Sequence, residues 1–244
     1  MEHKELKRLI PGARTAVLFI HGIAGTPNHF AQFIPLVPDS FSVYNLLLDG
    51  HGKGVKDFSN TSMAKWEAQV FAAVRELTET HDSVYIVAHS MGTLLAIEQA
   101  VANPKVKKLF LLAVPIKLFL KPPAVVNSTK VLFDKIDPDD PIAVAAKMCY
   151  GIEGDKNLLK YIGWIPRYLE LFQKIIKTQH RLPELFTSCR AYQSYNDELV
   201  SRSSVPYLES FGAITVNVLQ HSSHYYYTQE DMAYLLREFQ NYIV

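Results

Sequence analysis

The sequence of 244 residues lacks several features that would place it in a specialised class of protein. It contains two cysteines, Cys149 and Cys189, which cannot build a disulfide framework, so we expect a reduced, cytoplasmic protein. No apolar run approaches the roughly 18 residues that span a bilayer, and residues 1–14 lack the apolar segment of a signal peptide. The formal net charge is +1 with both signs scattered along the chain, which leaves no basic surface for nucleic acid.

Short apolar runs alternate with helical patterns through the first half of the chain. The expected strands are 16–20, 41–48, 83–88 and 106–114, and the expected helices are 27–36, 61–80 and 90–102. Wholly apolar runs such as 16–20 are typical of strands buried on both faces. Strands separated by helices imply βαβ units, so the sequence predicts an α/β protein with a mostly parallel central sheet flanked by helices.

Residues 115–183 interrupt this alternation. Prolines cluster there, and 166–178 form an amphipathic pattern with apolar and charged side chains on opposite sides. We interpret 115–183 as a small helical cap inserted into a core formed by 1–114 and 184–244. The alternation then resumes with expected strands 188–195 and 213–219 and a final helix over 228–242.

Ser90 is the candidate nucleophile. An apolar strand runs directly into it and a helix leaves directly after it, and such a turn exposes the serine hydroxyl at the carboxyl edge of the sheet. The tight turn needs small residues two positions before and after the serine, which are Ala88 and Gly92. A chance serine at a helix cap is the alternative, but the strand before it and the helix after it favour a nucleophile.

Acyl transfer also needs hydrogen-bond donors for the oxygen that becomes negatively charged. The loop His21-Gly22-Ile23-Ala24-Gly25 follows the first buried strand, and its glycines allow main-chain N–H groups to face a cavity. The expected donors are the N–H groups of Ile23 and Met91, the latter directly after Ser90. We interpret His21 as a residue that braces this loop.

A serine hydroxyl needs a base, and the base needs an acid that fixes its tautomer. Among nine histidines, only His221 and His224 follow the last expected strand, and His224 is favoured because it immediately precedes the final helix. The acid should follow the preceding strand, where Asp197 and Glu198 are adjacent. We favour Asp197, which follows a turn-forming asparagine, and interpret Glu198 as solvated surface.

The remaining polar residues suggest no further chemistry. Asp49 and His51 lie too early in the chain for this order of groups and are interpreted as loop structure. Both cysteines are interpreted as packing residues. No spacing of histidine, cysteine and carboxylate resembles a metal site, so we expect neither a metal nor a cofactor.

With these residues in place, the chain resembles the α/β-hydrolase superfamily, and most closely its carboxylesterase and monoacylglycerol-lipase branch. The motifs that carry the resemblance are FIHGIAGTP, DGHGKG, Trp66 in the following helix, VAHSMG, YNDELV and QHSSH. The resemblance implies a triad of Ser90, Asp197 and His224, main-chain donors at Ile23 and Met91, and a cap at 115–183. The sequence departs from the family pattern at Ala88 and Thr93, where glycine is common.

The resemblance implies hydrolysis of a small-molecule carboxylic ester through an acyl-enzyme on Ser90. A thioesterase or another acyl hydrolase with the same triad remains an alternative, as does a non-catalytic ligand-binding protein of this fold. Stable membrane insertion is not expected, although residues 117–120 or 225–227 could support peripheral attachment. Candidate substrate-lining residues in the cap are Phe119, Leu120, Trp164, Tyr168 and Phe172.

Overall fold

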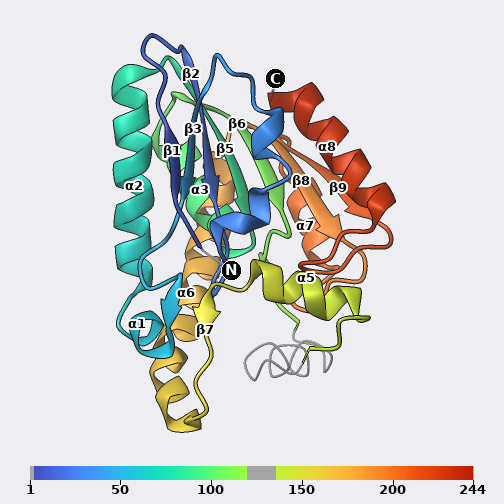
Figure 1. Ribbon diagram of the computed structural model, residues 1–244. Coiled ribbons are helices and arrows are strands. Elements are labelled where there is room, and N and C mark those ends of the chain that lie inside the picture. The colour runs from blue at the N-terminus through green and yellow to red at the C-terminus, as the bar shows by residue number, and fades with distance from the viewer. Residues whose placement is uncertain (1–2, 120–135, 244) are drawn as a thin grey trace.

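A seven-stranded sheet forms the centre of the computed structural model, which describes residues 3–119 and 136–243 (Figure 1). Its strands are β1 (Leu6–Arg8), β2 (Thr15–Ile20), β3 (Ser42–Leu46), β5 (Ser83–His89), β6 (Val106–Leu112), β8 (Ser188–Ser194) and β9 (Ile214–Leu219). Their order is β1-β3-β2-β5-β6-β8-β9, and all neighbours are parallel except β1 and β3. The predicted α/β class with a mostly parallel sheet is confirmed.

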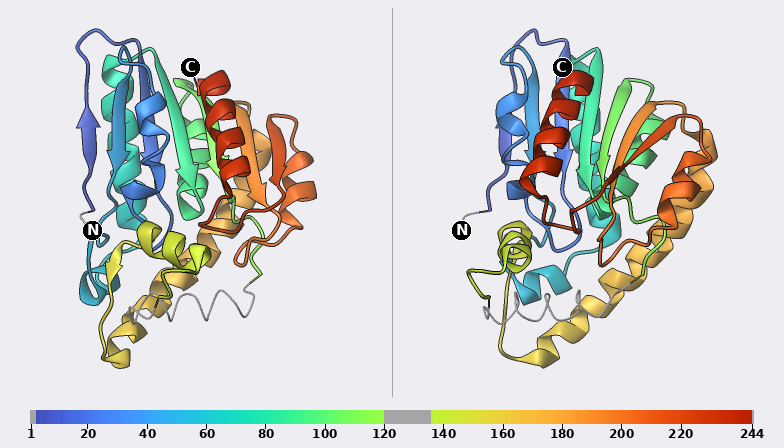
Figure 2. Two further views of the ribbon diagram at one scale, coloured as in Figure 1. Left: turned by 45° about the vertical axis from the view of Figure 1, so that its right-hand side comes forward. Right: turned by 90° about the vertical axis from the view of Figure 1, so that its right-hand side faces the viewer.

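Helices cover both faces of this sheet (Figure 2). One face is covered by α2 (Met63–Thr80), α3 (Met91–Ala102), α6 (Ile165–Arg181) and α7 (Ser204–Glu209), and the other by η1 (Pro27–Phe30), η2 (Ile34–Leu36) and α8 (Gln229–Ile243). The shorter elements are β4 (Lys53–Gly54), α1 (Val55–Ser59), α5 (Pro141–Cys149), β7 (Ile152–Glu153), η3 (Leu158–Trp164) and η4 (Leu182–Glu184). No helix within the described ranges is long and apolar enough to cross a membrane.

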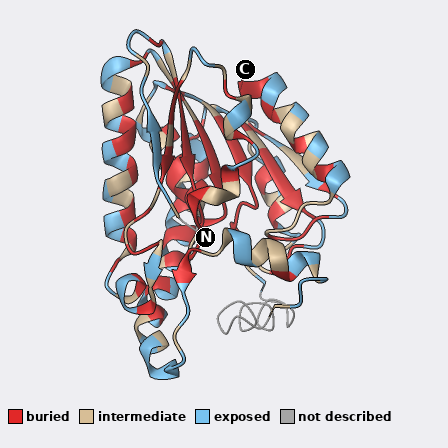
Figure 3. Ribbon diagram, viewed as in Figure 1, coloured by how far each residue is buried: buried red, intermediate tan, exposed pale blue. Residues whose placement is uncertain are grey.

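The core lies on both sides of the central strands, as the burial colouring shows (Figure 3). Along β2, Leu18 and Ile20 join the cluster beneath α2 and α3, while Val17 and Phe19 join the cluster beneath α8. All four side chains are fully buried. This double burial is why residues 16–20 of the strand are all apolar.

Two local expectations differ from the structure. The expected helix over 27–36 is split into the short turns η1 and η2, each with a proline in its first turn. The edge strand β1 was not expected, because its sequence Leu-Lys-Arg is polar and all three residues are exposed. By contrast, the helix expected over 61–80 is present as α2, which is capped by Ser62, whose hydroxyl accepts a hydrogen bond from the Lys65 N–H (3.2 Å).

The described part of 115–183 contains α5, β7, η3 and α6. It is joined to the body where β7 pairs in parallel with β4. Next to this pairing, Gly151 N–H donates to Ala24 O (2.8 Å) and Gly52 N–H donates to Gly151 O (2.6 Å). These bonds hold Gly151, just after α5, between the loop that follows β2 and the segment before β4. Division of the chain into a core and a cap stays a prediction.

Helix α6 has an unexpected orientation. Its buried side includes Arg167 and Lys174, whereas Leu169, Phe172 and Ile176 are more than half exposed. The Lys174 ammonium forms buried ion pairs with carboxylates on α2 and α3, and Arg167 donates to main-chain oxygens before α2. Charged contacts, and not only the apolar side, therefore attach this helix to the body.

Candidate active site

Ser90 occupies the sharp corner between β5 and α3. Its backbone has φ 51° and ψ −127°, in the left-handed region that side-chain-bearing residues rarely adopt. The surrounding structure holds this strained conformation, since the Ser90 N–H donates to Leu112 O of β6 (2.9 Å). The corner expected from the sequence is therefore present, at the carboxyl end of a central strand.

Small neighbours make this corner possible. A Cβ atom on Gly92 would lie 2.3 Å from Ile20 O and 2.7 Å from His21 O, so only glycine fits there. Thr93 occupies a position where glycine is common in the family, and its N–H (2.9 Å) and hydroxyl (2.7 Å) both donate to Ser90 O. Both hydrogen bonds stabilise the turn at Ser90.

Replacing Gly92 with alanine should destabilise the fold strongly. The added methyl group would press on two main-chain oxygens at the end of β2, which cannot move without shifting the strand. We expect a loss of about 3 kcal/mol or more in the free energy of unfolding, measured by urea denaturation. Gly212→Ala is the matched control, because a Cβ there meets no atom within 4 Å. Equal stability of the two variants would contradict the close approach at Gly92.

The loop after β2 lies directly against the nucleophile corner. A Cβ on Gly22 would lie 2.9 Å from the Ser90 Cβ, and the loop is closed by a hydrogen bond from Gly25 N–H to Gly22 O (3.0 Å). Met91 is the first residue of α3, so its N–H has no partner within the helix. These positions suit the expected donors Ile23 and Met91, whose role stays a prediction.

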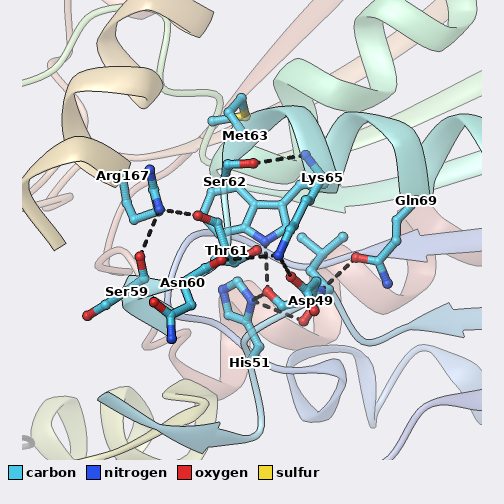
Figure 4. A network of polar contacts seen from close by, with 12 residues as sticks. Asp49, His51, Ser59, Asn60, Thr61, Ser62, Met63, Lys65, Gln69 and Arg167 are labelled. Atoms are coloured by element: carbon cyan, nitrogen blue, oxygen red, sulfur yellow. Dashed lines mark hydrogen bonds and ion pairs between the residues drawn. The ribbon is translucent and has the colours of Figure 1, made fainter. Parts of the chain in front are cut away.

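His21, Asp49 and His51 form part of the scaffold behind this loop. The His21 Nδ1–H donates to Gly22 O (2.9 Å) and its Nε2 accepts from Leu48 N–H (3.1 Å). Asp49 O accepts from the Trp66 indole (2.8 Å), and the His51 ring packs 5.3 Å from that of Trp66. The His51 Nδ1 also lies 3.2 Å from Asp49 O (Figure 4). The interpretation of these residues as loop structure is confirmed.

Asp197 and His224 come together at the same edge of the sheet. Asp197 follows β8 and His224 lies between β9 and α8, and the His224 Nδ1–H donates to Asp197 Oδ2 (2.9 Å). The second carboxylate oxygen accepts from the N–H groups of Leu199 and Val200, both at 2.8 Å. His221 is instead held in its loop, where its N–H donates to Asp231 (3.1 Å). Of the two candidate acids and the two candidate bases, the structure pairs Asp197 with His224.

The two groups shift each other's pKa in opposite directions. Burial alone would lower the pKa of His224, but the charge and hydrogen bond of Asp197, with a contribution from Glu198, leave it raised. Burial alone would raise the pKa of Asp197, but the imidazole and the two N–H donors leave it lowered. The His224 Nε2 atom is buried without a hydrogen-bond partner among the described residues. A base poised to accept a proton requires such a free nitrogen.

Side chains from two other segments hold the main chain of His224. Its N–H donates to Glu198 Oε2 (3.1 Å), and its carbonyl accepts from the His89 Nε2–H (3.0 Å). The interpretation of Glu198 as solvated surface is wrong, because the residue is only 9% exposed. The sequence did carry a signal for both residues, since Glu198 adjoins the predicted acid, Asp197, and His89 adjoins the predicted nucleophile, Ser90.

An aromatic cluster surrounds the His224 imidazole. The rings of His89 and Tyr225 lie 4.8 and 4.7 Å from that of His224, and His29 stacks on His89 at 3.9 Å. Burial lowers the pKa of His29 to about 3 and that of His89 well below its usual value, so both rings are neutral near pH 7. The His29 Nδ1 lies 3.3 Å from the Cys149 sulfur at the end of α5. No group of metal-binding residues occurs within the described ranges.

The candidate lining residues occupy several positions. Trp164 is buried beside α1, where its indole donates to a main-chain oxygen (3.2 Å). Phe119 is 59% exposed, and its N–H donates to the loop that follows Asp197. Tyr168 and Phe172 are partly exposed on α6. Leu120 lies outside the described residues. A role for these side chains in substrate binding stays a prediction.

The family of this chain follows from its sequence. The sequence matches the alpha/beta hydrolase family over residues 17–235, which is most of the chain. The chain belongs to the alpha/beta hydrolase family. The expected α/β-hydrolase fold, with a mostly parallel sheet flanked by helices, is thereby confirmed.

Solved structures resemble this alpha/beta hydrolase over nearly its whole length. A structure reported for the metagenome-derived lipolytic enzymes LipS and LipT has a TM-score of 0.73 and 19% identity, covering 97% of this chain and 95% of that one. The monoacylglycerol lipase of Paleococcus ferrophilus has a TM-score of 0.68 and 16% identity, covering 99% of both chains. At such low identities the likeness establishes the fold alone.

One curated relative matches over a shorter region. This is the dihydrolipoyllysine-residue acetyltransferase component of the acetoin cleaving system of Cupriavidus necator, which is 32% identical over 95 residues. The match covers 38% of this chain and 25% of the relative. It therefore says nothing about the activity of the chain as a whole.

Proposed function

We propose that this protein is a serine hydrolase that cleaves carboxylic esters through an acyl-enzyme on Ser90. The observation that carries the proposal is the buried Asp197–His224 pair, whose second imidazole nitrogen has no partner among the described residues. This pair lies beside the strained nucleophile corner, because His89, the neighbour of Ser90, contacts His224 directly. A strained serine, an oriented histidine and a buried carboxylate are the parts that nucleophilic acyl transfer needs.

In the acylation step, the Ser90 hydroxyl attacks the ester carbonyl while His224 Nε2 accepts its proton. The negative charge on the carbonyl oxygen is stabilised by the N–H groups of Ile23 and Met91. Asp197 keeps the proton of the neutral imidazole on Nδ1 and stabilises the imidazolium that forms. The imidazolium then gives its proton to the departing alcohol, which leaves the acyl group bound to Ser90.

In the deacylation step, His224 removes a proton from water, which attacks the acyl carbon. The second tetrahedral intermediate uses the same donors, and Ser90 takes back a proton from the imidazolium as the carboxylic acid departs. Each step needs His224 to be neutral when it begins. Because the pKa of this imidazole is raised, kcat/KM should rise with pH through that pKa and level off above it.

The substrate that best suits this site is a small-molecule ester with an apolar acyl group. The segment 117–119 runs beside the acid loop, where Leu118 pairs with Val200 and Phe119 N–H donates to Leu199 O (2.9 Å). Apolar side chains of the predicted cap, residues 115–183, are thus carried close to the proposed acid. Cys149 and Cys189 are unpaired, which suits the reducing cytoplasm that we propose for this enzyme.

A substrate panel combined with active-site labelling tests the proposal. A fluorophosphonate probe should label the protein once per chain and abolish its activity. Aryl esters of increasing acyl length and monoacylglycerols should be cleaved with higher kcat/KM than matched acyl thioesters. Higher values for the thioesters would identify a thioesterase, and absence of both labelling and turnover would indicate a ligand-binding protein.

A further inference from the structure

Glu198 stands next to the proposed acid but faces a different part of the base. Its Oε2 atom accepts a hydrogen bond from the His224 N–H (3.1 Å), while Asp197 accepts from the imidazole itself. The His89 side chain donates a second hydrogen bond, to the carbonyl oxygen of His224 (3.0 Å). Both main-chain polar groups of the base are therefore held by buried side chains.

The electrostatic surroundings of this imidazole are dominated by two carboxylates. Asp197 and Glu198 approach it from the loop after β8, and both raise its pKa. The other titratable groups around it are His89, His29 and Tyr225, which come from the end of β5, from η1 and from the same loop as the base. Burial lowers the pKa of both of these histidines and raises that of the tyrosine, so all three are neutral near pH 7.

We propose that Glu198 is a positioning residue with two effects on His224. Its oxygen fixes the main chain of the base, and its negative charge stabilises the imidazolium that forms during each proton transfer. The first effect needs only a hydrogen-bond acceptor, whereas the second needs a charge. This inference rests on the proposed role of His224 as general base.

The burial of Glu198 supports the electrostatic effect. A carboxylate is costly to bury unless it interacts with a positive charge or with several donors. A neutral glutamine could accept the His224 N–H equally well, so holding the loop does not by itself require a charge. A carboxylate at this position gains its interaction energy when the neighbouring imidazole becomes positively charged.

Glu198→Gln separates the two effects, because the amide oxygen can still accept the main-chain N–H while the charge is lost. The imidazolium loses a stabilising neighbour, so the pKa of His224 should fall. We expect the acidic limb of the kcat/KM profile to move to lower pH by roughly 0.5–1 unit. The plateau rate should fall less than about tenfold, because the positions of the reacting groups are retained.

Glu198→Ala removes both effects. It should show the same shift of the acidic limb and, because the loop is no longer held, a plateau rate lower by about 10- to 100-fold. Glu209→Gln removes a charge from an exposed site on α7 and serves as the matched control, with an unchanged profile. If Glu198→Gln kept the wild-type pH profile of kcat/KM while Glu198→Ala lowered the plateau rate, Glu198 would act only as a hydrogen-bond acceptor. That result would overturn the electrostatic effect.

An NMR titration of the His224 imidazole provides a readout that does not depend on turnover. The resonance is identified by its loss in His224→Gln, and its pKa is compared between the wild-type protein and Glu198→Gln. A lower pKa in the variant supports the inference even if no ester in the panel is cleaved. An unchanged pKa overturns it, whereas a wild-type protein that neither labels nor turns over contradicts the proposed function instead.

Discussion

Ser90→Ala is expected to abolish fluorophosphonate labelling and to lower kcat for the best ester by at least about 10⁴-fold. The reason is chemical, because alanine cannot form the acyl-enzyme, while His224 and the main-chain donors remain in place. The stability of the fold should change little, since alanine is strained at φ 51° to the same extent as serine. Labelling measured by intact mass and turnover measured under saturating ester test this expectation.

Ser62→Ala is the control for a serine outside the site. Ser62 caps α2, and its loss should cost about 1 kcal/mol in the free energy of unfolding without affecting turnover. A loss of activity in Ser90→Ala alone would therefore report on chemistry and not on folding. If Ser90→Ala were labelled as readily as the wild type, the assignment of the nucleophile would be wrong.

Asp197→Asn should lower kcat/KM by about 10³- to 10⁴-fold. The Asp197 Oδ1 atom accepts two main-chain N–H groups, so an asparagine oxygen would take this position and its NH₂ group would face the imidazole. His224 would then accept at Nδ1 and carry its proton on Nε2, which is the wrong tautomer for a base. Loss of the carboxylate should also lower the pKa of His224, so the residual activity should persist to lower pH.

The comparison between Asp197→Asn and Glu198→Gln identifies the acid. The second variant should lose less than about tenfold at its plateau, because it leaves the tautomer of the base unchanged. Asp82→Asn, on an exposed residue paired with Arg14, controls for the loss of a surface carboxylate. If Glu198→Gln abolished turnover while Asp197→Asn retained it, the two carboxylates would have to exchange roles.

Much of the fold and of the site could be predicted because their signals are local. The apolar strand before Ser90 and the small residue at 92 each reflect a requirement of a few neighbouring residues. Asp197 and His224 were selected because each follows an expected strand, and the parallel pairing of β8 with β9 brings the two side chains together.

The features that could not be predicted depend on which segments, far apart in the sequence, pack against one another. The pattern of α6 shows an apolar side and a charged side, but burial of Lys174 depends on the carboxylates of Glu67 and Glu98, more than 70 residues earlier in the chain. Glu198 looks like a surface residue until the His224 main chain is placed against it. Neither partner can be inferred from hydrophobic periodicity, since the pairing is set by tertiary structure.

The positions of the proposed site residues along the chain also bear on when activity can arise during synthesis. The nucleophile corner is made by β5 and α3, with a tether from β6, all of which lie within the first 112 residues. The proposed acid Asp197 and the proposed base His224 follow β8 and β9, respectively. On the proposed assignment, a chain that stops short of Asp197 and His224 would carry an inert Ser90 hydroxyl. Hydrolytic competence would therefore require synthesis through residue 224.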